Sequence, residues 1–206
     1  LPRIWNSLVN ATTEIVEASH TLAVLVDDEP GVLARVIGLF SGRGYNIESL
    51  TVSSVDTAAH LSRITIVTTG TPQIIVQIKA QLGRLVPVHA VHDLTIEGPH
   101  LERELALIKI RNVGEHRIEA LRIADVFRAR AIDSTLESFV FELTGSPSKI
   151  TAFVELMSAL GAIEVSRTGV VAIARGSNLD MPVFSTLEVN RKKAKQPAGK
   201  KAQKKA

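Results

Sequence analysis

The residues best suited to chemistry lie in the loop Asp28-Glu29-Pro30-Gly31, between a short apolar segment and an amphipathic pattern. At the start of a helix the first backbone N–H groups have no partner within the helix, so they can bind a small anion such as a carboxylate. Gly31 has no side chain to keep a ligand away from those groups. Alternatively, Asp28 or Glu29 simply caps the helix, with Pro30 in its first turn. The loop is therefore either a carboxylate-binding site or an ordinary helix start.

Other motifs that carry chemistry do not stand out in the sequence. The stretch Gly42-Arg43-Gly44 ends a helical pattern, whereas a dinucleotide fingerprint opens a helix and continues to a third glycine. His89 and His92 are three apart on an expected strand, so they point to opposite faces and do not share a metal ion. The chain has no cysteine, which excludes a thiol nucleophile and a thiolate metal site. We expect no catalytic residue, metal or cofactor in this chain.

The elements that must position the loop form a regular series. The apolar residues Leu33, Val36, Ile37 and Phe40 follow one face of an expected helix. The expected order is strand 21–27, helix 31–42, strands 45–52 and 62–68, a helix that begins at 70–72, and strand 86–94. This order makes a βαββαβ unit.

A second series of the same order follows. It comprises strand 105–110, helix 115–130, strands 132–137 and 139–144, a helix that begins at 145–147 and stops at Gly161, and a strand within 163–174. Two copies joined at Gly98-Pro99 predict an α+β fold of two tandem ferredoxin-like domains. We assign residues 1–19 to an N-terminal arm, 20–97 and 98–176 to the two domains, and 177–206 to a disordered basic tail.

A sheet with two helices on one face leaves the other face to be covered. With so few aromatic residues, pairing with the sheet or edge of a second protomer is the usual solution. We therefore expect at least a homodimer.

Charge is distributed unevenly along the chain. The net charge of +3 hides a tail, residues 191–206, that holds eight of the 24 Lys and Arg residues and no acid. The other 190 residues carry 16 basic and 21 acidic groups, a net charge of −5. The tail has no aromatic residue to stack on bases, which favours a disordered solubilising segment over a nucleic-acid site. No apolar run reaches the length of a membrane span, and residues 1–20 lack a signal peptide's core, so we expect a soluble cytoplasmic protein.

The ungapped stretch from Asp28 to Val52, DEPGVLARVIGLFSGRGYNIESLTV, resembles the ACT domain of the small, regulatory subunit of acetolactate synthase (acetohydroxyacid synthase). Further matches lie at 61–66, 102–109 and 167–172, and the resemblance covers about residues 20 to 176. It implies a non-catalytic subunit that binds and activates the catalytic large subunit and makes it sensitive to valine, in the first common step of branched-chain amino acid synthesis. Thiamine diphosphate, Mg and FAD then belong to the large subunit.

The resemblance also implies a ligand site, which lies between the ACT domains of two protomers. By position, the amides around Gly31, Val32 and Leu33 receive the carboxylate of valine. Asn46 and Ile47 come from the other protomer, with Asn46 bonded to the polar end of the amino acid. Leu33 and Ile47 help to enclose the isopropyl group.

One ligand-site residue departs from the family pattern. Position 28 is Asp, where the pattern usually has Asn. A carboxamide can donate a hydrogen bond to the ligand, whereas an ionised carboxylate only accepts and repels the ligand's carboxylate while favouring its ammonium group. This difference leads to the hypothesis that Asp28 weakens or alters feedback inhibition while activation survives.

Two interpretations from other classes remain open. One is a stand-alone amino-acid sensor that regulates transcription, with the Lys-rich tail touching DNA; it needs a DNA-reading helix or ribbon, and none is evident in the sequence. The other is an enzyme with an unrecognised active site. Turnover of 2-oxo acids by the purified chain alone would decide for the enzyme.

Overall fold

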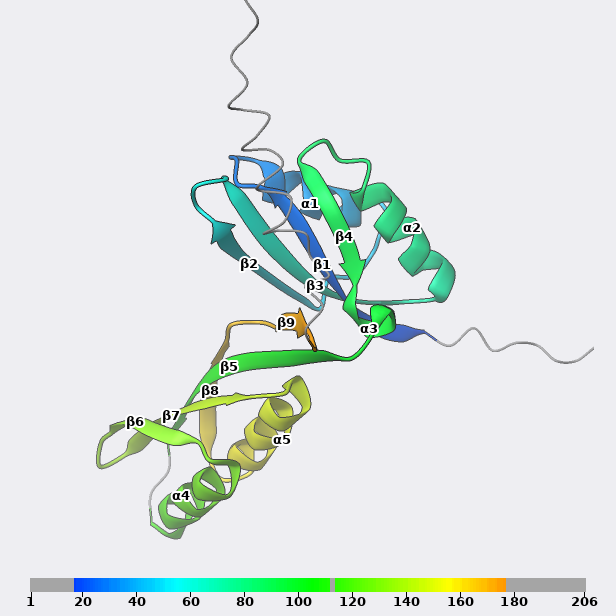
Figure 1. Cartoon of the computed structure of the whole chain (residues 1–206). Coiled ribbons are helices and arrows are strands. Elements are labelled where there is room, and N and C mark those ends of the chain that lie inside the picture. The colour runs from blue at the N-terminus through cyan, green and yellow to red at the C-terminus, as the bar shows by residue number, and fades with distance from the viewer. Residues whose placement is uncertain (1–16, 112–113, 177–206) are drawn as a thin grey trace, which may run out of the picture.

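The computed structural model describes residues 17–111 and 114–176 as two α+β units (Figure 1). The predicted basic tail and residues 1–16 of the predicted arm lie outside this range. The first unit contains β1 Ala18–Asp27, α1 Val32–Ser41, β2 Ser49–Asp56, β3 Leu61–Gly70, α2 Pro72–Leu82, β4 Val88–Asp93 and the short α3 Leu94–Glu97. The second contains β5 His100–Arg111, α4 Glu115–Phe127, β6 Arg130–Ser134, β7 Ser138–Gly145, α5 Pro147–Ser158, β8 Ala162–Arg167 and β9 Val171–Ala174.

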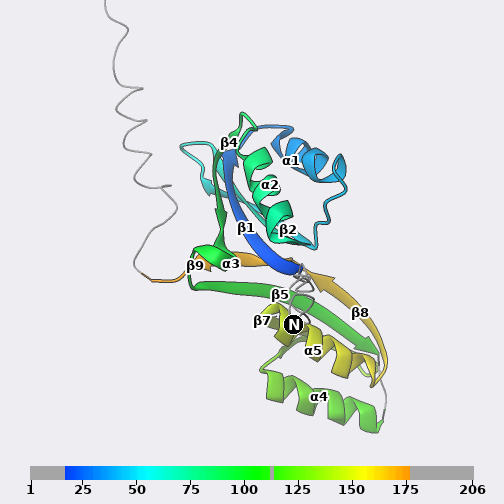
Figure 2. The ribbon, with the colours of Figure 1, turned by 90° about the vertical axis from the view of Figure 1, so that its right-hand side faces the viewer.

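The predicted fold class is confirmed: each unit is ferredoxin-like. The first sheet has the order β2-β3-β1-β4 and the second the order β6-β7-β5-β8, with antiparallel neighbours throughout. Each sheet packs two helices on one face, and the two cores form separate apolar clusters. In both views α4 and α5 lie on the side of the second unit that is farther from the first unit (Figures 1 and 2).

Short polar residues set the start of the second helix in each unit. Thr71 caps α2 by accepting a hydrogen bond from the Ile74 amide, and Ser146 caps α5 in the same way from the Lys149 amide. A proline follows each cap, at the position where a helix needs no N–H donor. The sequence therefore predicts these two helix starts correctly.

The core-facing side of α1 differs from the prediction. Val32, Val36 and Phe40 are buried, while Leu33 and Ile37 are 37% and 38% exposed. The helix ends at Ser41, and Gly42 is its C-cap, so the prediction that Gly42-Arg43-Gly44 ends a helix is confirmed. The sequence carries two overlapping apolar stripes, and only one of them faces the sheet.

Several boundaries also differ from the prediction. Residues 45–48 form a loop and not the start of a strand, since β2 begins at Ser49. In the second unit α4 ends at Phe127, because Arg128 adopts a left-handed conformation with a φ of 57°. Helical periodicity predicts a core face made of Ile118, Leu121, Ala124 and Phe127. Ala124 is buried and Phe127 packs against the core, whereas Ile118 and Leu121 are exposed and Ala120 is buried in their place.

The final predicted strand, within 163–174, divides into β8 and β9. β8 continues the second sheet, whereas β9 pairs with the first residues of β5 and lies against the first unit. Ala172 of β9 packs with Ala23 and Leu94 on the face of the first sheet that carries no helices. The chain's own β9 therefore covers part of this open face (Figure 2), a contact that the sequence did not predict, and the homodimer stays a prediction.

The short helix α3 lies beside a polar cluster of the first unit, which is partly buried. His20 Nδ1 lies 2.8 Å from Asp93 Oδ2, and the Asp93 side chain is fully buried. Glu97 accepts hydrogen bonds from Lys79 Nζ, the Asp93 amide and His92. Partial burial disfavours the charged form of Glu97, but these hydrogen bonds outweigh that effect and lower its pKa to about 2.

This cluster predicts a pH dependence of stability. The folded-state pKa of Glu97 lies below its ordinary value of 4.5, so its stabilising contribution is present above that value and is lost as the pH falls toward 2. We expect Glu97→Gln to lower the free energy of unfolding at pH 5.5 by less than about 1 kcal/mol, because the side chain is partly exposed, and by less still at pH 3. Urea denaturation at both pH values measures the difference, and an equal loss at both would contradict it.

Candidate functional site

The loop before α1 leaves the helix start without a side-chain cap. Gly31 is the N-cap residue, with a φ of 88°, and no side chain of the described residues accepts a capping hydrogen bond from the first turn. Asp28 and Glu29 are exposed. The alternative that one of them caps the helix is therefore wrong. The Val32 amide donates to the Glu29 carbonyl at 3.3 Å. The other N–H groups of the first turn, together with the positive end of the helix dipole, suit a carboxylate.

The side chains around this helix start fall into two groups. Val32 is 4% exposed and packs into the first core, so only its backbone can reach a ligand. Leu33 and Ile37, one helical turn apart, are both more than a third exposed. The helix start thus combines N–H groups that suit an anion with an apolar surface, which is the combination that an aliphatic amino acid requires.

Asn46 and Ile47 lie in the loop between α1 and β2. The carbonyl of Asn46 accepts a hydrogen bond of 2.6 Å from Thr68 Oγ1, and its side chain is exposed. Ile47 is half-buried and packs against the core of the first unit. Two residues later the loop becomes β2, an edge strand whose neighbour is β3.

The two parts of the predicted ligand site lie at opposite ends of the first sheet. Asn46 is anchored to Thr68, which pairs with His20 near the start of β1. The Gly31 loop instead follows Asp27, the last residue of β1. Seven residue-to-residue steps along β1 separate His20 from Asp27, or roughly 23 Å at the usual rise per residue. Within one chain the structure does not bring Gly31 and Asn46 together.

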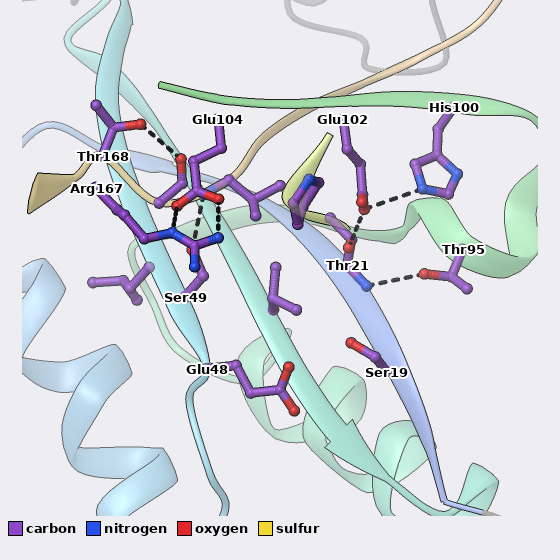
Figure 3. A pocket seen from close by; sticks show the side chains of 15 residues that line it. Ser19, Thr21, Glu48, Ser49, Thr95, His100, Glu102, Glu104, Arg167 and Thr168 are labelled. Carbon is purple, nitrogen blue, oxygen red and sulfur yellow. Dashed lines mark hydrogen bonds and ion pairs between the residues drawn. The ribbon is translucent and has the colours of Figure 1, made fainter. Parts of the chain in front are cut away.

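A cavity of about 700 Å³ lies between the two units (Figure 3). Most of the side chains that line it are polar, and they come from both units: Ser19, Thr21, Glu48, Ser49, Leu50, Val67, Thr95, His100, Glu102, Glu104, Pro147, Arg167, Thr168, Gly169 and Val170. None of the predicted ligand-site residues is among them. The cavity is a second polar region, distinct from the start of α1.

An ion pair forms one wall of this cavity. Arg167 donates two hydrogen bonds to the carboxylate of Glu104, of 2.8 and 2.5 Å (Figure 3). Glu104 is only 4% exposed, and its hydrogen bonds raise the pKa of Arg167 above its ordinary value. Farther along the cavity, the Thr21 hydroxyl donates to Glu102, which also lies 3.2 Å from His100 Nε2 (Figure 3). The polar groups of the cavity are thus engaged largely with one another.

Within residues 17–111 and 114–176 no group of three or more His, Asp or Glu side chains could hold a metal ion. Over the same ranges no helix has both the length and the apolar character needed to cross a bilayer. The contacts between the units have no predictive pattern in the sequence, although segments 102–109 and 167–172 match the family. Charged residues inside those strand-forming segments were the available signal.

A βαββαβ unit with an uncapped, glycine-led helix start, followed by a second ferredoxin-like unit, has the architecture of an ACT-domain regulatory protein. Two family models match the chain. The model described as the AHAS small subunit-like ACT domain matches residues 22–90, and the model described as the small subunit of acetolactate synthase matches residues 103–176. The chain belongs to the family of acetolactate synthase small subunits.

Individual relatives agree with this assignment. The acetolactate synthase isozyme 3 small subunit of Escherichia coli is 44% identical over 159 residues, which cover 77% of this chain and 96% of the relative. The small subunit of Haemophilus influenzae is 44% identical over 156 residues, 75% of this chain and 94% of its own. The crystal structure of the small subunit from Thermotoga maritima has a TM-score of 0.70 and 37% identity, and the match covers 78% of this chain and 99% of that one.

Proposed function

We propose that this chain binds and activates the thiamine-diphosphate-dependent catalytic subunit of acetolactate synthase and makes it sensitive to valine. The observation that carries the proposal is the match of both units to the small-subunit family. Thiamine diphosphate, Mg and FAD are bound by the catalytic subunit. The small subunit acts by binding an effector and not by chemistry of its own.

The arrangement of the first sheet supports a dimer as the effector-binding form. Asp27, at the end of β1, and Asp56, at the end of β2, both pair with Leu61, so the Gly31 loop lies near the end of β2. Asn46 lies just before the start of β2. If two β2 edges pair antiparallel, the start of one strand meets the end of the other. The Gly31 loop of one protomer then lies beside the partner's Asn46.

Such an interface suits valine in each of its parts. The carboxylate binds amides at the start of α1, and the partner's Asn46 bonds the polar end of the amino acid. The exposed Leu33 and the partner's Ile47 enclose the isopropyl group. Valine favours one arrangement of the dimer, and a coupling of about 1–3 kcal/mol between that arrangement and the active catalytic subunit is enough for inhibition.

Co-purification with a catalytic subunit tests the proposal. The tagged chain is expected to retain a thiamine-diphosphate enzyme, to raise its acetolactate production, and to make that production fall when valine is added. The purified chain alone is expected to form a dimer whose melting temperature rises with valine. A monomer with no thermal response, together with no effect on the enzyme, would refute the proposal.

Asp28 gives a prediction about the strength of inhibition. Its exposed side chain lies at the helix start, where an ionised carboxylate repels the carboxylate of the effector. We expect Asp28→Asn to lower the valine concentration for half-inhibition by roughly three- to tenfold, with activation unchanged. Inhibition curves of the reconstituted enzyme with both proteins measure this change, and equal sensitivity would show that Asp28 does not face the effector.

A further inference from the structure

A three-residue segment, Thr168-Gly169-Val170, connects the second unit to the strand that follows the Asn46 loop. We call it the 168–170 bridge. On one side, the Thr168 amide donates to the Leu105 carbonyl at 3.0 Å, and the Leu105 amide donates to Thr168 Oγ1 at 3.2 Å. The bridge is thereby fixed to β5 of the second unit.

On its other side the bridge holds β2 through two hydrogen bonds, both made by Val170. The Val170 amide donates to Ser49 Oγ at 2.9 Å, and Thr51 Oγ1 donates to the Val170 carbonyl at 2.9 Å. Val170 is only 5% exposed, so water does not readily replace these bonds. The backbone donor and acceptor of Val170 are thus both satisfied by hydroxyl groups of β2.

Gly169 makes this close approach possible. Its φ is +83°, and a Cβ atom there would lie 2.8 Å from Ser49 Oγ and 3.0 Å from Thr51 Oγ1. Any other residue therefore combines an unfavourable backbone conformation with a collision against the two hydroxyls. The close contact between the bridge and β2 therefore requires glycine at position 169.

The bridge matters because β2 is an edge strand. Its residues pair with β3 on one side only, and its face away from the helices carries Ser49, Thr51 and Ser53. Leu50, which points the other way, packs on the core. Asn46 and Ile47 lie just three and two residues before Ser49. A contact that fixes Ser49 and Thr51 therefore also limits how far the Asn46 loop can move.

We propose that Ser49 and Thr51 are positioning residues for the effector site: through the 168–170 bridge, the second unit holds Asn46 and Ile47 where the partner's helix start requires them. This inference rests on the proposed valine site. It assigns to the second unit a role in effector affinity, carried by two hydroxyl groups that do not themselves touch the effector.

The test compares variants of the full chain, each reconstituted with the catalytic subunit. Thr51→Val removes the hydroxyl at nearly constant volume and leaves the Val170 carbonyl unpaired, and Ser49→Ala removes the other bond. Loss of one such hydrogen bond is expected to raise the valine concentration for half-inhibition by roughly three- to tenfold. Activity without valine is expected to stay within about twofold, since the first core is untouched. Thr51→Ser keeps the hydroxyl and is expected to restore the native response.

Ser53→Ala is the matched control, because Ser53 lies on the same face of the same strand, two residues beyond Thr51 and away from the bridge. A native response from Ser53→Ala together with restoration by Thr51→Ser supports the proposal. The proposal fails if Thr51→Val keeps the native valine response, if Ser53→Ala matches its effect, or if activation and inhibition decline in parallel. If the native enzyme itself ignores valine, the effector site fails as well, which separates the two outcomes.

Discussion

Gly31→Asp is expected to abolish the response of the reconstituted enzyme to valine while activation persists. The substitution places a carboxylate at the N-cap of α1, where no side chain of the described residues now caps the first turn. That carboxylate competes for the N–H groups and repels the carboxylate of valine at a distance of roughly 4 Å, an interaction of several kcal/mol at a partly desolvated site. We therefore expect the valine concentration for half-inhibition to rise by roughly a hundredfold or more. Inhibition curves measure it.

Gly31→Ala separates charge from backbone strain. Gly31 has a φ of +88°, and a Cβ atom at this position would meet no atom of the described residues within 4 Å. Any side chain there therefore costs conformational energy without a collision. Both variants are expected to lose about 1–2 kcal/mol of stability, but only Asp abolishes the response. If Gly31→Ala and Gly31→Asp abolish the valine response equally, the response depends on the loop conformation and not on the added charge. A native response from Gly31→Asp would show that no carboxylate binds there.

Arg167→Ala is expected to cause the largest loss of stability among the variants considered. It leaves Glu104, which is 4% exposed, without the two hydrogen bonds that Arg167 now donates. An ionised group left unpaired in the interior costs about 3–5 kcal/mol, and the partial exposure of Arg167 places the expected loss near the lower figure. Against a total stability of about 5–15 kcal/mol this is a large fraction. The midpoint of urea denaturation measures it.

A double variant checks that the unpaired charge is the cause. In Glu104→Gln the buried carboxylate is already neutral, so adding Arg167→Ala is expected to cost much less than the same change in the native chain. The combined variant is therefore expected to be more stable than Arg167→Ala alone. If the two changes add independently, the loss comes from the packing of the arginine stem and not from the ion pair.

The sequence predicts the elements of this fold better than their orientation. Thr71-Pro72 and Ser146-Pro147 predict helix starts, because the capping hydrogen bond and the proline both lie within four residues of the chain. In α1, by contrast, apolar residues occur in adjacent pairs, so periodicity fits two neighbouring faces equally well. The sheet selects the face that includes Val32 and Val36, and the other face, with Leu33 and Ile37, is left exposed. That choice depends on tertiary contacts.

The sequence predicted the helix start of the candidate site but not the 168–170 bridge that contacts β2. The Gly31 helix start follows from local pattern, and the uncapped geometry agrees with the carboxylate interpretation and not with the capping one. The 168–170 bridge has no local signature, since it depends on hydroxyl groups of β2 meeting Val170 from more than a hundred residues away. Contacts of this kind depend on how two folded units pack against each other, which no local sequence pattern specifies.

The bridge also bears on the order in which the protein assembles during synthesis. Its bonds to Thr51 and Ser49 join residues 119 and 121 positions apart, so a ribosome releases nearly all of the second unit before they can form. Domains generally fold as they emerge from the ribosome. The helix-free face of the first sheet is therefore exposed to water until the second unit has been synthesised. The hydroxyl groups of Thr21, Ser49 and Thr51 lie on that face and can bind water, which lowers its tendency to aggregate until β9 packs against it.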